Sequence, residues 1–368
     1  MTDENNETTM SKRVDLIQPG GFVAGKNLVT TQVASVTAAA NQILIDIRAS
    51  AVQPLDWKMA EHGFFLAKSG GATALGCDIA GTVVAVSSSS SSSSSPEQES
   101  SWQVGQRVVT YLGGDKSQFG VTRPGFADTT AVDADLVFAV PQGMTLAQAA
   151  ALPVGGITAT ALLNDLDDDN NNNSNSNSNN KSNRWVLVWG ASSSVGWSAI
   201  SLATQQRGYK VIAVASPKHA SSLTKLGAAA VVDYKQSAET VLTAVKDTLQ
   251  GATLHGALDC IGTADSFAGA AALVQACGNK GTISTVNGQG TPQPPAGITK
   301  KAVVVGSLQD AATRDLVKSS MPAVLKYCRP PKLRLVQGSI SAETVEKAFK
   351  MQKQGMSGEK VVIEWKKQ

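Results

Sequence analysis

Glycine and serine residues between an apolar strand and a helix form the pattern in this sequence most able to bind a charged group. The strand is expected at Trp185–Trp189 and the helix from Trp197 to about Arg207; between them stand Gly190-Ala191-Ser192-Ser193-Ser194-Val195-Gly196. Such a turn points free backbone N–H groups and the positive end of the helix dipole at a pyrophosphate. The spacing is that of a GxxGxxG turn in which Ser193 replaces the middle glycine. We therefore predict a dinucleotide site at Ser192, Ser193, Ser194, Val195 and Gly196, although a turn that only closes a strand–helix unit has the same composition.

The end of the next strand indicates which dinucleotide would bind. NAD-selective sites carry an Asp or Glu about 20 residues after the turn, where it binds the ribose 2′-hydroxyl. This sequence has no acid there, but offers Ser216 and Lys218, with Tyr234 after the following strand. A hydroxyl, a cation and a phenol suit a 2′-phosphate, so we predict NADPH; a lysine exposed on a loop is the alternative reading.

Candidate metal ligands are scarce and scattered. The chain has three histidines (His62, His219 and His255), and its four cysteines stand far apart (Cys77, Cys260, Cys277 and Cys328). A zinc site needs several nitrogen or sulfur ligands that converge. We therefore predict no metal site, and we interpret Cys77 as a small buried residue.

The elements that position these residues follow two different patterns. From Thr145 onward, apolar strands alternate with helices, as in a doubly wound domain with a parallel sheet. Before that point the sequence favours short strands. Ile43, Ile45 and Ile47 alternate along Gln42–Ala49, and Thr82–Val86 and Arg107–Tyr111 are expected to pair as a hairpin of a small barrel or sandwich.

Two low-complexity tracts interrupt these patterns, at residues 87–101 and 165–183. Neither can bury apolar surface, so both are predicted to be surface loops inside domains. A phospho-acceptor role for the serines stays open beside passive insertion.

Composition narrows the class of protein. The 368 residues carry a net charge of +3 and 42% hydrophobic residues, which favours a soluble enzyme over a binder of nucleic acid or of acidic membranes. No apolar run approaches the ~20 residues of a membrane span. The first residues, MTDENNETTMSKR, lack the pattern of a signal or transit peptide, so a cytoplasmic location is expected.

Several segments, in this order, resemble the medium-chain dehydrogenase/reductase superfamily: GCDIAGTVVAV, WQVGQRV, GFADTTAVDADLVFAVPQGMTLAQAAALPVGGITA, WVLVWGASSSVG, KLGAAAVVDY and SGEKVVIE. ASSSVG followed by ASPKH is most similar to the zinc-independent branch of quinone oxidoreductases and fungal trans-acting enoyl reductases. The resemblance implies an α/β fold with a GroES-like β-barrel domain (residues 1–143 and 308–368) and a doubly wound Rossmann NADPH-binding domain (residues 144–307). The positions of the family's zinc ligands hold no cysteine in Val52–Asp56 and no histidine in Gly76-Cys77-Asp78.

The same resemblance implies roles near the nicotinamide. Gln53–Lys58 matches an Asn-Pro-x-Asp-x-Lys loop beside the nicotinamide ribose, which makes Asp56 and Lys58 the expected catalytic pair. Lys58 would also offer charge near the substrate oxygen; the alternative is that Asp56 only pairs with Lys58 or caps a helix. Cys260 and Ile261 would flank the nicotinamide, and Lys360 and Val361 belong to the segment that would fold back against it.

Phe65 stands where related enoyl thioester reductases carry a tyrosine that acts as a proton donor, and phenylalanine has no proton to give. We expect Phe65, Val154, Ile157 and Val286 to line an apolar substrate pocket. The sequence thus predicts a metal-free, NADPH-dependent reductase that adds hydride to the activated C=C of an enone or enoyl thioester. A quinone or alkenal reductase and a non-catalytic NADPH-binding protein are the alternatives. Both a homodimer and a polyketide synthase partner stay open.

Overall fold

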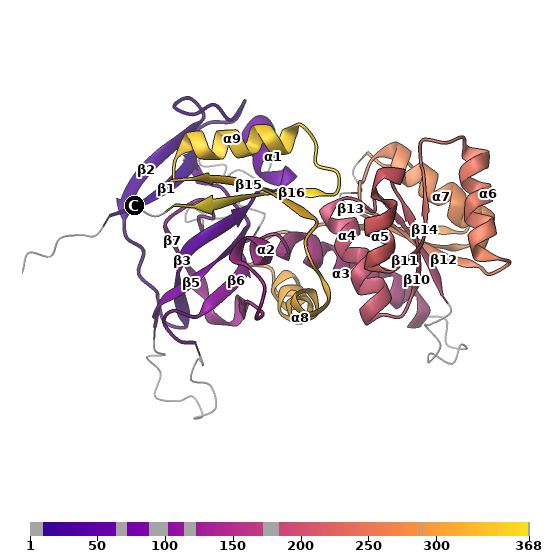
Figure 1. The fold of residues 1–368 in the computed structure, drawn as a ribbon, viewed down its shortest axis with the longest axis horizontal. Coiled ribbons are helices and arrows are strands. Elements are labelled where there is room, and N and C mark those ends of the chain that lie inside the picture. The colour runs from indigo at the N-terminus through magenta and orange to yellow at the C-terminus, as the bar shows by residue number, and fades with distance from the viewer. Residues whose placement is uncertain are drawn as a thin grey trace, which may run out of the picture.

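Two lobes, each built on β-sheet, lie side by side, and the lobe that contains the first strands also contains the last one (Figure 1). The computed structural model describes residues 10–63, 72–87, 102–113, 123–171, 184–286, 288 and 290–366, without the side chains of residues 168–171. Within these residues, no helix is both long and apolar enough to cross a bilayer.

The second lobe contains a six-stranded sheet in which every neighbouring pair is parallel. In spatial order its strands are β11 (Ala228–Val232), β10 (Lys210–Val214), β9 (Trp185–Trp189), β12 (Leu254–Asp259), β13 (Gly281–Val286) and β14 (Ile298–Val303). Its helices are α3 (Pro153–Asn171), α4 (Ser194–Ser201), α5 (Ala220–Leu226), α6 (Ala238–Leu249), α7 (Ala264–Gly278) and α8 (Ala311–Tyr327). The predicted doubly wound sheet is confirmed.

Side chains of the central strand alternate between two cores. Val186 and Val188 belong to the core that includes α3 and α4, whereas Leu187 belongs to the core that includes α6 and α7. All three are fully buried. A strand buried on both faces reads as a continuous apolar run, as WVLVW does.

The first lobe contains a seven-stranded and a three-stranded sheet. The larger has the order β15 (Lys332–Gly338), β16 (Glu359–Trp365), β3 (Gln42–Ala51), β5 (Asp78–Val86), β6 (Arg107–Tyr111) and β8 (Val137–Ala139), with β7 (Thr129–Asp133) paired to β3. The smaller has the order β2 (Leu28–Ala34), β1 (Met10–Leu16) and β4 (Thr73–Ala74). The helices of this lobe are α1 (Pro54–His62), α2 (Leu146–Ala150) and α9 (Ala342–Lys353).

Two predictions about this lobe are confirmed. Ile43, Ile45 and Ile47 are all fully buried on one face of β3. The β5 and β6 strands pair antiparallel, with Thr82 opposite Arg107.

Two expectations about loops were wrong. Gln53–Lys58 was expected to be a loop, but Pro54 begins α1, because the Asp56 carboxylate accepts a 2.7 Å hydrogen bond from the Gln53 N–H. Residues 165–171 of the second low-complexity tract are helical, because α3 continues to Asn171. There Asp165 accepts a hydrogen bond from Ser284 at 2.5 Å, and Asp167 binds Arg207. The rest of that tract and residues 88–101 of the first lie outside the described residues.

The expected domain limits, 143/144 and 307/308, stay a prediction. The α2 helix packs on β3 and β5 of the first lobe, and α8 packs on α3 of the second. Judged by packing alone, the first limit would move to the end of α2 and the second to the end of α8.

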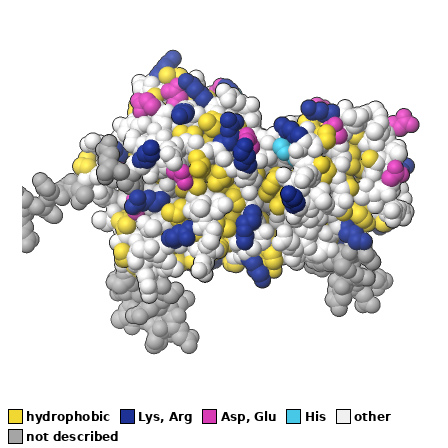
Figure 2. All heavy atoms as spheres, viewed as in Figure 1, with side chains coloured by type: hydrophobic (Ala, Val, Ile, Leu, Met, Phe, Trp, Pro, Cys, Tyr) yellow, Lys and Arg dark blue, Asp and Glu magenta, His cyan; other side chains and the backbone are white. Residues whose placement is uncertain are grey.

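Basic side chains stand in separate groups over both lobes on the face in Figure 2. This distribution fits the small net charge of +3.

Candidate active site

The glycine and serine turn predicted to bind a dinucleotide follows β9 and opens α4. Ser193 caps the helix, since its Oγ accepts a 3.0 Å hydrogen bond from the Gly196 N–H. A Cβ on Gly196 would lie 2.4 Å from the Gly190 carbonyl oxygen, so a larger residue does not fit there. Ser192, Ser193, Ser194 and Val195 are half-buried and Gly196 is buried. The turn is a tight backbone cradle of the kind that binds pyrophosphate.

The residues predicted to bind the 2′-phosphate lie along the same edge of the sheet. Ser216 and Lys218 follow β10, and Tyr234 follows β11, the next parallel strand. Lys218 and Tyr234 are exposed, whereas Ser216 is half-buried. The structure therefore places all three beyond the carboxyl ends of neighbouring strands, where ligands of such sheets bind.

A segment near the end of the chain closes over this turn. The Gly358 N–H donates to the Ser192 carbonyl at 2.9 Å, and the Ser357 Oγ lies 3.3 Å from the Ser192 Oγ. His219 Nε2 lies 2.7 Å from the same Ser357 oxygen. Partial burial, and then the charge of Lys218, lower the pKa of His219. Sequence reasoning missed His219 and Ser357, because nothing local links two residues 138 positions apart.

The loop after β12 also reaches the turn. The Ile261 side chain packs against Gly190, where a Cβ would lie only 2.4 Å from its Cγ1 atom. Ile261 is 46% exposed. Asp259 holds the loop, since it accepts 3.1 Å hydrogen bonds from the N–H groups of Ile261 and Gly262. Cys260 is buried, and burial together with the Asp259 charge raises its pKa, so the group is a thiol. Cys260 and Ile261 are thus brought to the turn.

A buried polar network in the first lobe joins residues far apart in the sequence and reaches the first turn of α3. The Lys360 ammonium donates to Gln53 Oε1 at 2.5 Å, and Gln53 Nε2 donates to Asp78 Oδ2 at 2.6 Å. Asp78 also accepts hydrogen bonds of 3.1 and 3.2 Å from the Val154 N–H, in the first turn of α3. Lys360, Gln53 and Asp78 are each at most 4% exposed. We call these three residues and Asp56 the buried charge network.

Asp56 holds the backbone of this network. One carboxylate oxygen accepts from the Gln53 N–H at 2.7 Å, and the other accepts from the Gly76 N–H at 3.2 Å. The Cys77 thiol lies 3.8 Å from that second oxygen. Lys58, expected to act with Asp56, is exposed on the other side of α1, with its ammonium 5.7 Å from the centre of the Trp57 ring. The structure does not bring Asp56 and Lys58 together.

Burial pushes two of these groups toward their neutral forms. Loss of solvent raises the pKa of Asp78 to about 7, although the Lys360 charge and the Val154 N–H oppose the rise. Loss of solvent lowers the pKa of Lys360 to about 8, opposed by the charges of Asp78 and Asp56. Both groups therefore titrate near neutral pH, which is common for residues at functional sites.

The donors in this network do not fit a zinc ion. Among the described residues, no group of three or more His, Cys, Asp or Glu side chains is placed to hold a metal. Asp56, Cys77 and Asp78 instead lie close enough to the buried ammonium of Lys360 for their charges to act on it, and this ammonium would repel a dication.

Two predicted site residues turn out to be core residues. Ile157 is fully buried inside α3, so its assignment to a pocket wall stays a prediction without support from this structure. Val361 is fully buried in β16, and its carbonyl accepts a 3.0 Å hydrogen bond from the Val52 N–H, so its assignment to the cofactor stays a prediction as well. Val154 and Val286 are half-buried. Phe65 lies outside the described residues.

Comparisons with known proteins agree with the two-lobed fold. Residues 39–142 match the model of the alcohol dehydrogenase GroES-like domain, and residues 194–326 match the model described as zinc-binding dehydrogenase. The trans-enoyl reductase himH of Aspergillus japonicus is 31% identical over 333 residues, which cover 88% of this chain and 89% of that protein.

Two solved structures share the fold. The CurK enoyl reductase superposes with a TM-score of 0.72 at 19% identity, covering 97% of this chain and 99% of that one. The quinone oxidoreductase from Coxiella burnetii superposes with a TM-score of 0.65 at 20% identity, covering 97% of this chain and 100% of that one.

Proposed function

Because this chain belongs to the medium-chain dehydrogenase/reductase superfamily, in the branch of the fungal trans-enoyl reductases, we propose that it is a metal-free NADPH-dependent reductase. Its substrate would be an enone or an enoyl thioester. The observation that carries the proposal is the buried charge network, in which Lys360 and not a metal ion supplies positive charge beside Asp56, Cys77 and Asp78.

The cofactor would bind along the edge formed by β9, β10 and β12. The turn from Ser192 to Gly196 would hold the pyrophosphate with its backbone N–H groups. Ser216, Lys218 and Tyr234 support NADPH over NADH, because they offer donors and a cation where an NAD site would have a carboxylate. Cys260 and Ile261 would contact the nicotinamide end.

Bound NADPH would supply hydride to the β-carbon of the acceptor, and negative charge would then develop on the carbonyl oxygen. The ammonium of Lys360, shielded from water, would stabilise such a charge more strongly than an exposed cation could. Asp56 would act as a positioning residue, because it fixes the backbone of Gln53 and Gly76. A direct role for the exposed Lys58 stays a prediction.

Steady-state kinetics with EDTA present tests this proposal. The purified protein should oxidise NADPH with an enone or a 2-enoyl thioester, and a strict requirement for zinc would refute it. Substitution Lys218→Ala should raise the KM for NADPH about 10-fold or more, since a charge-assisted hydrogen bond to phosphate is lost, while the KM for NADH stays unchanged. Lys225→Ala is the matched control, because Lys225 is an exposed lysine at the other end of α5.

The main alternative is a quinone or alkenal reductase, which the shared fold of the Coxiella burnetii enzyme supports. The same assay with quinones and short alkenals separates the two, because the preferred acceptor is the one with the highest kcat/KM. Tight NADPH binding without turnover of any acceptor would instead indicate a non-catalytic NADPH-binding protein. The proposal also includes a homodimer or a polyketide synthase partner, and a cytoplasmic location. Size-exclusion chromatography tests the dimer, co-purification tests the partner, and cell fractionation tests the location.

A further inference from the structure

The loop between α9 and β16 joins the two lobes at the edge where the cofactor would bind. We call residues 354–358 of this loop the strap. The flanking elements, α9 and β16, belong to the first lobe, and the loop extends from them toward the second lobe (Figure 1). There Gly358 donates to the Ser192 carbonyl, and Ser357 hydrogen-bonds with His219. The strap thus contacts the part of the second lobe that would receive the dinucleotide.

Ser357 bridges two parts of the proposed cofactor site. Its Oγ lies 3.3 Å from the Ser192 Oγ and 2.7 Å from His219 Nε2. Ser192 belongs to the turn that would hold the pyrophosphate, and His219 directly follows Lys218, which would bind the 2′-phosphate. A dinucleotide bound at both places has its adenosine ribose between them, in the space that Ser357 bridges. The bridge must therefore open for the cofactor to enter or leave.

The conformation of the strap allows it to open by itself. Gly355 and Gly358 have φ angles of +93° and +69°, in a region that glycine adopts without strain. Gln354, Gly355 and Ser357 are exposed, and Met356 packs only partly on the core. A segment with so little buried apolar surface can open while the core around it stays folded.

His219 contacts the strap through both its ring and its nitrogen. A Cβ on Gly358 would lie 2.6 Å from the ring Cε1, so the ring packs directly on this glycine. Partial burial and the Lys218 charge lower the pKa of His219, opposed by the charge of Glu359, so the ring is neutral at neutral pH. The bond with Ser357 therefore joins two uncharged groups. Such a bond favours the closed strap only several-fold and lets it open readily.

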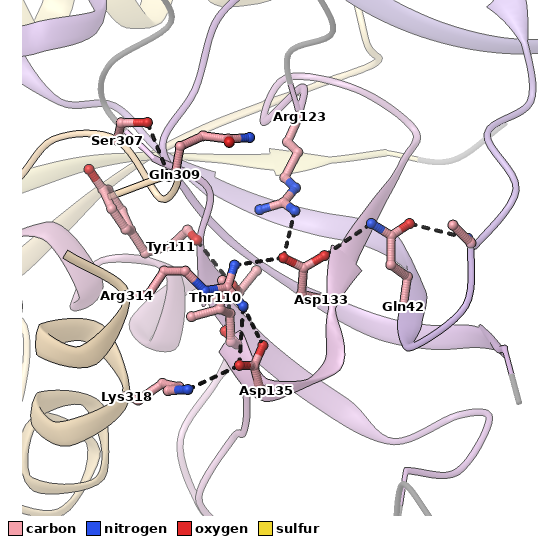
Figure 3. Close-up of polar contacts among 12 residues, drawn as sticks. Gln42, Thr110, Tyr111, Arg123, Asp133, Asp135, Ser307, Gln309, Arg314 and Lys318 are labelled. Atoms are coloured by element: carbon pink, nitrogen blue, oxygen red, sulfur yellow. Dashed lines mark hydrogen bonds and ion pairs between the residues drawn. The ribbon is translucent and has the colours of Figure 1, made fainter. Parts of the chain in front are cut away.

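Separation of the lobes would be a more costly way to open the site. On α8, Arg314 pairs with Asp133 and Asp135 at 2.8 and 2.9 Å, and Lys318 pairs with Asp135 at 3.1 Å (Figure 3). Both carboxylates belong to the first lobe, at the end of β7 and just after it. These ion pairs would have to break if α8 moved away with the second lobe. Opening of the strap leaves all of them intact.

We propose that the strap opens to admit and release NADPH, and that the hydrogen bond between His219 and Ser357 holds it closed. The strap closes in the same way over the bound cofactor, so loss of this bond speeds both entry and exit. The inference rests on the proposed cofactor site. It goes beyond that site because it gives His219 and Ser357 a role in the rates of binding.

Two variants remove the bond and leave the rest of the contact in place. Ser357→Ala removes the hydroxyl and keeps the backbone bond from Gly358 to the Ser192 carbonyl. His219→Phe removes Nε2 and keeps a ring against Gly358. Because Ser357 is exposed, S357A should fold as the wild type does.

Two further variants are controls. Ser319→Ala matches S357A, because Ser319 is another exposed serine, and its hydroxyl donates within α8 to the Asp315 carbonyl at 2.7 Å. Lys318→Met removes an ion pair between α8 and the first lobe. It should speed binding only if the lobes have to separate.

Stopped-flow fluorescence of NADPH gives the association rate constant, and displacement of bound NADPH by excess NADP⁺ gives the dissociation rate constant. S357A and H219F should raise both constants about 3-fold or more and leave the Kd within about 2-fold of the wild type. S319A and K318M should match the wild type. A bond with a purely structural role would change stability to urea and neither rate constant.

Rate constants that S357A and H219F leave unchanged would overturn the proposal. Faster dissociation alone, with a higher Kd, would overturn it as well, because His219 and Ser357 would then only contact the bound cofactor. An equal rise in K318M would show that the lobes separate instead. If NADPH binds with the expected rates but no acceptor is reduced, the reductase activity is refuted and the role of the strap stands. A protein that does not bind NADPH would refute both.

Discussion

Asp78 is the residue whose charge should make stability depend most clearly on pH. Its carboxyl is fully buried, and burial raises its pKa to about 7 from 3.8. The folded protein therefore keeps a proton on Asp78 at pH values where the unfolded chain has released it. With the folded state binding more protons, the free energy of unfolding falls as pH rises from about 4 to about 7.

The size of this effect follows from the same values. Each pH unit between the two pKa values contributes about 1.4 kcal/mol. Between pH 5 and pH 8, Asp78 should therefore reduce the free energy of unfolding by about 3 kcal/mol. Asp78→Asn cannot ionise, so its stability relative to the wild type should improve by about that amount over this range. Without the Asp78 charge, the pKa of Lys360 falls further. This shift also makes the D78N protein gain stability relative to the wild type as pH rises.

Urea unfolding followed by tryptophan fluorescence, at several pH values from 5 to 8, measures this difference. Asp310→Asn is the control. Hydrogen bonds from Thr313 lower the pKa of Asp310, so its contribution to stability changes only below about pH 4. The D310N difference should stay flat from pH 5 to pH 8. A D78N difference that is equally flat would refute the reasoning.

The remaining predictions concern the same network and the turn. Lys360→Met should destabilise the fold by about 1–3 kcal/mol, because the buried Gln53 Oε1 loses its donor. It should also keep Asp78 protonated to higher pH, because the Lys360 charge that lowers the pKa of Asp78 is gone. D78N/K360M should cost less than the two single changes combined, and urea unfolding of all four proteins gives the coupling. Gly196→Ala places a Cβ 2.4 Å from the Gly190 carbonyl oxygen, so NADPH binding measured by fluorescence titration should weaken about 10-fold or more. Gly306→Ala, where a Cβ would meet nothing within 4 Å, should bind NADPH as the wild type does, and equal affinity in both variants would contradict the steric argument.

The parts of the fold that the sequence predicts well are those with a local signal. The β9 strand has the predicted bounds, because a continuous apolar run between turn residues is a local pattern. The buried isoleucines of β3 follow from strict alternation in the same way. The start of the first lobe was harder to predict. Apolar and polar residues alternate poorly in β1 and β2, so the sequence predicts no strand there.

The site shows the same division. The turn at Ser193 could be found because its strand, glycines and helix are contiguous. The buried charge network could not, because Gln53 and Lys360 are 307 positions apart and nothing in either neighbourhood indicates the other. Asp56 was identified through a resemblance, but its position inside α1, facing away from Lys58, depends on packing.

The place of β16 has a consequence for biosynthesis. This strand lies between β15 and β3, with Val362 opposite Ala51, so residues 49–51 of β3 lack a partner on that edge until residues 359–365 leave the ribosome. The six-stranded sheet is translated entirely within that interval and can fold first. A strand edge left without a partner invites association with other nascent chains, so the yield of native protein in a cell should depend on how well chaperones shield this end of β3 during elongation.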